Sequence, residues 1–419
     1  MTVHRMRKGI MFSIILFFLA VTLTGLIAIQ RSLISYRRER IYIEMRIKSL
    51  NNMYDSLIRD AGSTLDTSLR RAMSAAFSNV SSPPGIGLSE ANETLKELVL
   101  DGTLDGVPVQ DLMKNATFPY WIEKIEKIGV LKGFYIDITL HTLEIKPYDS
   151  FNLLAEAKMN VNITDIQGVA ALNRLTLVKK PVSIEGLEDP LYPLNTGGFM
   201  TNTIEGGSHI GNYTQLLLTG SGGCTGNCYE YEVATQNDIF PNFQNKILVV
   251  NDADDVANLE SAKAVISENS IEGAITIPYV VKSGAKNNIS EGMNVLVDVV
   301  AGQGRVWYIE NFKEHVENSY YQPSDEGPSY LDRLEGKTEI QSKYSSQTIN
   351  VIGLESFIKK QNIPPGVPVD ADKTNIDYLY FSSGPLGNEV KGISTVSNSF
   401  RIDDINGRQQ NYSVDQIIE

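Results

Sequence analysis

The sequence predicts an α+β protein, in which a long N-terminal helix precedes an antiparallel β-meander subdomain and a second, mixed α/β subdomain. Three observations lead to this prediction. Residues 10–29 contain no charged side chain. Residues 30–78 lack proline and repeat apolar side chains at spacings of three and four, as a helix with one apolar face does. Beyond residue 134, several segments alternate apolar and polar side chains, which indicates strands with one buried face.

The first 29 residues are typical of a membrane anchor. Residues 1–9 are basic, and 13 of the 20 residues in 10–29 are Ile, Leu, Phe or Val. A helix of this length spans about 30 Å, the thickness of a bilayer's hydrocarbon core. A cleaved signal peptide is the alternative, but its apolar stretch is usually only about 7–15 residues long. We therefore expect a retained, single-pass transmembrane helix at 10–29 with the lipid bilayer as its partner.

Residues 30–78 are predicted to continue as an amphipathic stalk helix. Its apolar stripe either packs on the protein's own head or forms a coiled-coil seam with another subunit, and the small number of heptads favours the first. The tandem prolines Pro83 and Pro84 end the helix. The stripe comprises Ile43, Ile47, Leu50, Tyr54, Leu57, Ala61, Leu65, Leu69, Met73 and Ala76.

The head is predicted to comprise residues 79–200 (short helices and the β-meander), a loop-rich connection at 201–245, and the mixed α/β subdomain at 246–419. In the first part we expect helices at 90–99, 109–114 and 120–131 and strands at 134–145, 151–163 and 175–184, the last with Leu175, Val178, Val182 and Ile184 as its apolar residues. In the last part we expect strands at 247–250, 274–281 and 378–381, a hairpin of 294–300 with 305–309, helices at 252–268 and 353–360, and pairing of 391–394 with 400–402.

Charge divides the chain sharply. Residues 1–48 hold nine of the 37 Lys and Arg and two of the 50 Asp and Glu, which leaves 28 and 48 in residues 49–419. Such an acidic head argues against nucleic acid as a partner, because phosphate binding needs a basic surface. The basic residues on the two sides of the apolar run slightly favour a cytoplasmic head. Seven Asn-x-Ser/Thr sequons and a pair of cysteines favour the opposite, so we expect a cytoplasmic N-terminus and an extracytoplasmic head. The sequons begin at Asn79, Asn92, Asn115, Asn162, Asn212, Asn288 and Asn411.

The two cysteines of the chain, Cys224 and Cys228, are separated by three residues. They could supply half of a zinc site with His209 nearby, but Zn²⁺ takes four ligands and no second cysteine pair exists. We expect a local disulfide in an oxidising compartment.

Other candidate motifs have a structural interpretation. Asp252, Asp254 or Asp255 can cap the helix expected after them, although the segment also resembles a cation loop. Glu188 and Asp189 stand beside a proline turn, where capping or salt-bridging is expected rather than acid–base chemistry. Residues 302–304 have glycine spacing but no helix start to hold a phosphate. We predict no cofactor, metal site or catalytic residue, and enzymatic activity remains open.

Several blocks resemble an uncharacterised family of archaeal membrane-anchored surface proteins. The most specific block is Pro181-Val-Ser-Ile-Glu-Gly-Leu-Glu-Asp-Pro-Leu-Tyr192, followed by Asn195-Thr-Gly197. The resemblance implies an archaeal surface protein and no particular reaction. The other blocks are Leu50-Asn-Asn-Met53, Asn115-Ala-Thr-Phe118 with Trp121, Pro147-Tyr-Asp-Ser-Phe151, Asn162-Ile-Thr-Asp165, Ile376-Asp-Tyr-Leu-Tyr380 and Phe400-Arg-Ile-Asp403.

The N-terminus also resembles a type IV pilin leader. This resemblance implies cleavage between Gly9 and Ile10 and contacts with other pilin-like or envelope proteins through the apolar helix. Many bacterial pilins carry Glu at the fifth mature position, where this chain has Ile14. We therefore expect an extracytoplasmic structural or interaction protein, pilin-like and minor in its assembly. The alternative is a membrane-tethered enzyme or ligand-binding module with a site between the head subdomains.

Overall fold

The computed structural model describes residues 3–207, 214–219, 229–234, 246–250, 280–282, 295–300, 303–367, 369–390, 400–412, 414 and 418. The protein is mixed helix and sheet, with a long apolar N-terminal helix and small antiparallel sheets, as predicted. Its residues group into two compact units. The first contains residues 1–71, 96–144 and 155–180, and the second contains 72–95, 145–154 and 181–419.

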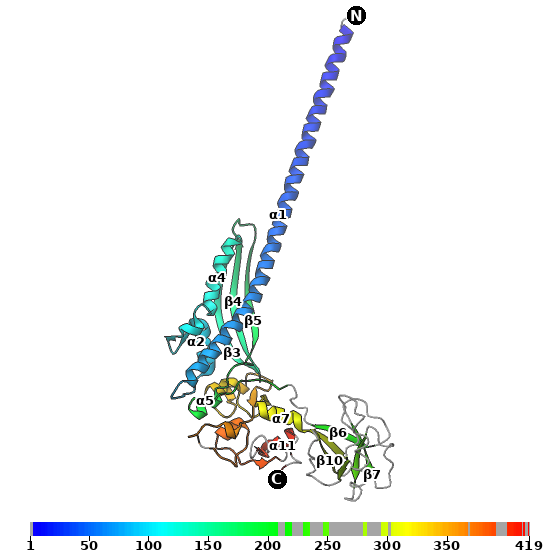
Figure 1. Cartoon of the computed structure of the whole chain (residues 1–419). Coiled ribbons are helices and arrows are strands. Elements are labelled where there is room, and N and C mark those ends of the chain that lie inside the picture. Colours follow the sequence, from blue (N-terminus) through cyan, green and yellow to red (C-terminus); the bar gives the residue numbers. More distant parts are fainter. Residues whose placement is uncertain are drawn as a thin grey trace. The chain divides into compact units, whose positions relative to one another are not determined.

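Helix α1 (Val3–Ser81) is continuous over 79 residues, which confirms the predicted helix through the apolar run and the stalk. Within the first unit, Figure 1 shows it projecting far beyond the sheet. The large apolar side chains between Phe12 and Ile29 are 45–67% exposed. By length and composition, α1 is the one helix in the described part of the chain that could cross a membrane, either as an anchor or as a signal sequence.

Between Leu50 and Leu69 the apolar stripe of α1 packs within the protein's own first unit. Leu57, Ala61 and Leu65 are at most 2% exposed, and the Tyr54 hydroxyl lies 2.7 Å from that of Thr176 in the sheet. The expectation that the stripe packs on the head is therefore confirmed for this part of α1. Ile43 and Ile47, closer to the N-terminus, remain 37% and 45% exposed.

The three-stranded sheet of β3 (Phe134–Asp149), β4 (Asn152–Asp165) and β5 (Ala171–Ser183) is the predicted meander, in the order β3-β4-β5. Alternate side chains of β4 from Leu153 to Ile163 are at most 2% exposed, as the period of two predicted. Among the apolar residues of the predicted third strand, Val178 and Val182 are buried, whereas Leu175 is 57% exposed. Thr176 and Val178 face α1 instead, so Leu175 lies in the opposite phase of the strand.

Helix α4 (Phe118–Leu131) packs against both α1 and β3. The indole N–H of Trp121 donates to Asp60 of α1 at 2.7 Å. Gly129 allows close approach to the sheet, because a Cβ at this position would lie 2.6 Å from Ile136. The predicted helices at 90–99 and 109–114 are confirmed as α2 (Ala91–Asp101) and α3 (Gln110–Met113), and between them lies the short ribbon of β1 (Thr103–Leu104) and β2 (Val107–Pro108).

The second unit contains a six-stranded sheet in the order β10-β11-β6-β7-β8-β9. The predicted hairpin is confirmed as an antiparallel pair of β10 and β11, and β6 to β9 pair in parallel. The predicted helix at 252–268 and most of the connection at 201–245 lie outside the described residues. The strands are β6 (Thr214–Thr219), β7 (Tyr229–Ala234), β8 (Lys246–Val250), β9 (Val280–Lys282), β10 (Val295–Val300) and β11 (Gln303–Tyr308).

Two predictions about the C-terminal part were wrong. The segment expected as a helix at 353–360 begins as strand β13 (Gly353–Glu355), paired with β12 (Gln322–Ser324). A Cβ on Gly353 would collide with the backbone of Gly327, so glycine permits this close approach of two backbone segments. The segment expected as a strand at 378–381 is helix α10 (Asp377–Phe381), in which the Tyr380 N–H donates to the Ile376 carbonyl at 2.8 Å.

The remaining elements are short, and several of them contribute to an aromatic core. Phe312, Phe357, Phe400 and Tyr412 are fully buried, with ring centroids 4.9–5.9 Å apart. The predicted pairing of 391–394 lies outside the described residues, and among the described ones Asn388–Glu389 pairs with 401–402. These elements are α5 (Leu191–Thr196), α7 (Ile309–Asn318), α8 (Tyr330–Leu334), α9 (Ser342–Ser345), η3 (Lys360–Asn362), β14 (Asn388–Glu389), β15 (Arg401–Ile402), η4 (Ile405–Gly407) and α11 (Arg408–Asn411).

Candidate functional site

Several residues singled out in the sequence lie outside the described part of the chain. They are Cys224, Cys228, His209, Asn212, Asn288 and residues 251–255, so the disulfide and the helix cap stay predictions. Gly9 and Ile10 lie in the helical backbone of α1. Among the residues that the structure describes, no group of three His, Cys, Asp or Glu side chains could hold a metal ion.

The Glu188-Asp189 turn does form a salt bridge, as the sequence suggested for this motif. Asp189 is fully buried and pairs with the guanidinium of Arg333, which is also fully buried. The same guanidinium nitrogen lies 2.8 Å from Asp377. The Tyr321 hydroxyl donates to Asp189 at 2.8 Å, and the Ser356 hydroxyl donates to Asp377 at 2.9 Å. We call these five side chains the Arg333 network.

The Arg333 network is a structural arrangement. Two carboxylates share one guanidinium, which leaves one net negative charge away from water. Burial therefore raises the pKa of the Asp189 carboxyl, and the neighbouring Asp377 adds to this effect, whereas Arg333 opposes it. Every member has hydrogen-bond partners inside the protein, so no group is left to meet a ligand.

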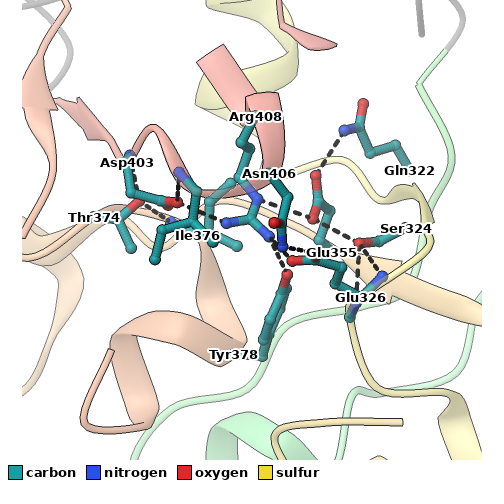
Figure 2. Close-up of polar contacts among 12 residues, drawn as sticks. Gln322, Ser324, Glu326, Glu355, Thr374, Ile376, Tyr378, Asp403, Asn406 and Arg408 are labelled. Carbon is teal, nitrogen blue, oxygen red and sulfur yellow. Dashed lines mark hydrogen bonds and ion pairs between the residues drawn. The ribbon is translucent and has the colours of Figure 1, made fainter. Parts of the chain in front are cut away.

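A second polar cluster lines an open pocket of about 420 Å³ and is the candidate functional site. Its floor is the β12–β13 ribbon, which contributes Ser324 and Glu355, and its wall is η4 with α11, which contributes Asn406 and Arg408 (Figure 2). All of it belongs to the second unit. The lining consists of Gln322, Pro323, Ser324, Asp325, Glu326, Glu355, Ile405, Asn406, Arg408 and Asn411.

Arg408 is the centre of this pocket. Its side chain is 5% exposed, and its guanidinium lies 2.7 Å from Asp403 and 2.9 Å from Glu326. It also donates to the Tyr378 hydroxyl at 2.6 Å and lies 3.7 Å from Glu355 (Figure 2). Three carboxylates thus surround one cation, and only Glu326 among them is substantially exposed, at 38% of its side chain.

Glu355 is the most deeply buried acid of the pocket. It accepts hydrogen bonds from Gln322 at 2.8 Å, Ser324 at 2.8 Å and Tyr412 at 2.6 Å. Burial raises the pKa of its carboxyl, although the Tyr412 hydroxyl and the Arg408 guanidinium oppose the shift by favouring the carboxylate. The pocket therefore combines a buried acid of raised pKa with the partly exposed Glu326 and the exposed Asp325.

This lining suits the binding of a small polar ligand. It carries three carboxylates and one guanidinium, so its formal charge is negative, and the rest of its polar groups are amides and one hydroxyl. Such a site attracts ligands that donate hydrogen bonds or carry positive charge, and it repels anions.

Sequence reasoning missed the pocket because its residues come from 322–326, 355 and 405–411. One local signal existed. Asn406 has a positive φ of 54°, a conformation that non-glycine residues adopt uncommonly and that occurs more often at functional sites. Asn411, singled out only as a sequon, also lines the pocket. Comparison of the chain with known protein families, with curated proteins and with solved structures finds no match.

The Arg333 network gives a stability prediction. Replacing Arg333→Met leaves two buried carboxylates without their cation and should cost about 3–5 kcal/mol of unfolding free energy. The triple variant Arg333→Met, Asp189→Asn, Asp377→Asn should recover part of this loss, because no charge remains buried there. Urea unfolding of the full chain in detergent, followed by tryptophan fluorescence, measures both. Lys127→Met is the control, since its ion pair with Glu123 is exposed on both sides and worth about 0–1 kcal/mol. A loss below 1 kcal/mol for Arg333→Met contradicts the prediction.

The pocket gives a pH prediction. The pKa of Glu355 is higher in the folded protein than its usual 4.5. Between pH 4.5 and the folded pKa, the folded state therefore binds more protons than the unfolded chain. The unfolding free energy of the wild type, relative to Glu355→Gln, should therefore fall as the pH rises above about 4.5 and level off above the folded pKa. Unfolding curves between pH 4 and 8 test this, with Glu339→Gln, an exposed position, as the control. A difference that is constant with pH, or that grows, is incompatible with the raised pKa.

Proposed function

We propose that the protein is a membrane-anchored, extracytoplasmic structural or interaction protein of the archaeal cell envelope. One observation carries the proposal. From Phe12 to Ile29, a segment without charge, α1 exposes its large apolar side chains, while Leu50, Leu57 and Leu65 of the same helix are buried in the first unit. Such a segment is stable in contact with lipid or with other apolar helices and costly in water.

The acidic composition beyond residue 48 and the sequons support an external head. The resemblance of residues 1–29 to a type IV pilin leader supports processing between Gly9 and Ile10. Ile14 stands where many pilins place a glutamate that pairs with the new amino terminus. Burying that ammonium without a partner costs several kcal/mol. A minor position in a pilus-like assembly, where one helix end stays near water, fits this better than repetition along a filament.

Protease added to intact cells tests the topology. We expect degradation of the head and survival of a fragment containing residues 10–29, detected by mass spectrometry. The same preparation reports the N-terminus: Ile10 supports the pilin-like role, whereas Met1 or Thr2 indicates a plain anchor. A cytoplasmic protein serves as the control for cell integrity. Full protection of the head while lysed cells allow its degradation contradicts the proposal.

A membrane-tethered ligand-binding module is the second candidate, and the pocket around Arg408 favours it. Its negative lining selects a small ligand that carries amino groups. The pocket belongs wholly to the second unit, and a site between the head subdomains stays a prediction.

Spermidine is the probe for this second candidate, and inorganic phosphate is the control ligand. Calorimetry on the full chain in detergent should show binding of spermidine and none of phosphate. Asp325→Asn removes an exposed carboxylate of the lining and should weaken binding about two- to five-fold, the effect of one exposed ion pair. Glu339→Gln, outside the lining, should leave the affinity unchanged. Equal binding of both ligands, or no effect of Asp325→Asn, argues against an amine site.

A further inference from the structure

The five sequon asparagines within the described residues differ in their backbone setting. Asn79 lies in α1, Asn92 in α2, Asn162 in β4 and Asn411 in α11. Asn115 alone among these five lies in a turn, between α3 and α4. It is exposed and has a φ of 59°, a left-handed conformation that Asn tolerates better than most residues. An accessible surface loop is the setting in which a sequon can accept a saccharide.

The turn that carries Asn115 is held firmly against α1. The Ser68 hydroxyl donates to the Ala116 carbonyl at 2.6 Å. Thr117, the third residue of the sequon, caps α4 by accepting from the Tyr120 N–H at 3.3 Å. The sequon therefore has one defined conformation in the folded protein, with the Asn115 side chain at the edge of a groove.

The groove beside Asn115 has a volume of about 310 Å³ and is lined by Ser and Thr hydroxyls, by the rings of Tyr120 and Trp121, and by the charged Asp60, Arg71 and Lys124. The hydroxyls of Ser63 and Thr67 donate back to helix carbonyls at 3.2 and 3.1 Å, so their oxygens are left as acceptors. Tyr120, 40% exposed, adds an aromatic ring to the lining. Hydroxyl acceptors beside an exposed ring complement the hydroxyls and the apolar face of a sugar.

We propose that Asn115 carries an N-linked saccharide whose first sugar lies in this groove. The bond that forms joins Asn115 Nδ2 to the anomeric carbon of the sugar. The bond that breaks joins that carbon to the phosphate of a polyprenyl phosphate-linked saccharide donor. The phosphate leaves with the electron pair, and the amide gives up one proton. This inference rests on the proposed external position of the head.

Glycopeptide mass spectrometry of the full chain, purified from an archaeal host that glycosylates its surface proteins, tests the acceptor. The Asn115 peptide should carry at least one sugar, and those of Asn79, Asn92, Asn162 and Asn411 should not. Asn115→Gly removes the acceptor while keeping the left-handed backbone, and Thr117→Ser keeps both the sequon and the helix cap, so only the former should abolish the mass increase. An unmodified Asn115 in a head that external protease degrades overturns the site alone. A head protected from protease overturns the topology and the site together.

A thermal double-mutant cycle tests the groove. Thr67→Val removes one acceptor at nearly constant volume. It should lower the melting temperature by about 1–4 °C more in the glycosylated protein than in the Asn115→Gly background, the effect of one hydrogen bond. Equal shifts in the two backgrounds show that the sugar lies outside the groove and overturn that part of the proposal.

Discussion

The buried charge of Arg333 is the constraint on which the second unit depends. A guanidinium without water is stable only where carboxylates and carbonyls surround it. Here Asp189, Asp377 and the Leu354 carbonyl do so, and they come from distant segments of the chain. The turn before α5, the start of α10 and strand β13 must therefore meet at α8. Since Glu355 follows Leu354 directly, the network also fixes the floor of the pocket.

In the pocket around Arg408, a guanidinium is again surrounded by carboxylates, but closer to solvent. Asp403 is almost fully buried and holds the guanidinium from within, whereas Glu326 is partly exposed. The buried groups are engaged with one another, so they supply shape and negative potential more than reactive chemistry. Recognition at this site would fall to the exposed groups, of which Asp325 is one. Buried charged groups that pair with one another, beside exposed ones that face solvent, fit ligand binding better than acid–base catalysis, which needs groups free to exchange protons with a substrate.

Helix α1 has two environments along its length. Between Leu50 and Leu69 its stripe is buried within the first unit, and there the helix is stabilised mainly by tertiary packing. On the N-terminal side of Leu50 its large apolar side chains are exposed, including Leu33 and Ile41. The stripe pattern is the same in both parts. The change of environment therefore comes from where the sheet ends.

The sequence by itself determined the elements in which a local pattern of apolar and polar side chains repeats over many residues. The apolar run, the stalk stripe and the alternation in β4 each repeat a local period over many residues, so the periodicity alone identified α1 and the meander. Short segments lacked this redundancy. Leu354, Phe357 and Ile358 have helical spacing, yet pairing with β12 makes their segment begin as a strand, and α10 is a helix despite its aromatic residues. Only the tertiary structure decided the pocket and the Arg333 network, because their members lie far apart in the chain: Asp189 precedes Arg333 by 144 residues. The sequence around a charged residue does not show which residue it pairs with, and its burial depends on distant segments that pack over it in the folded protein.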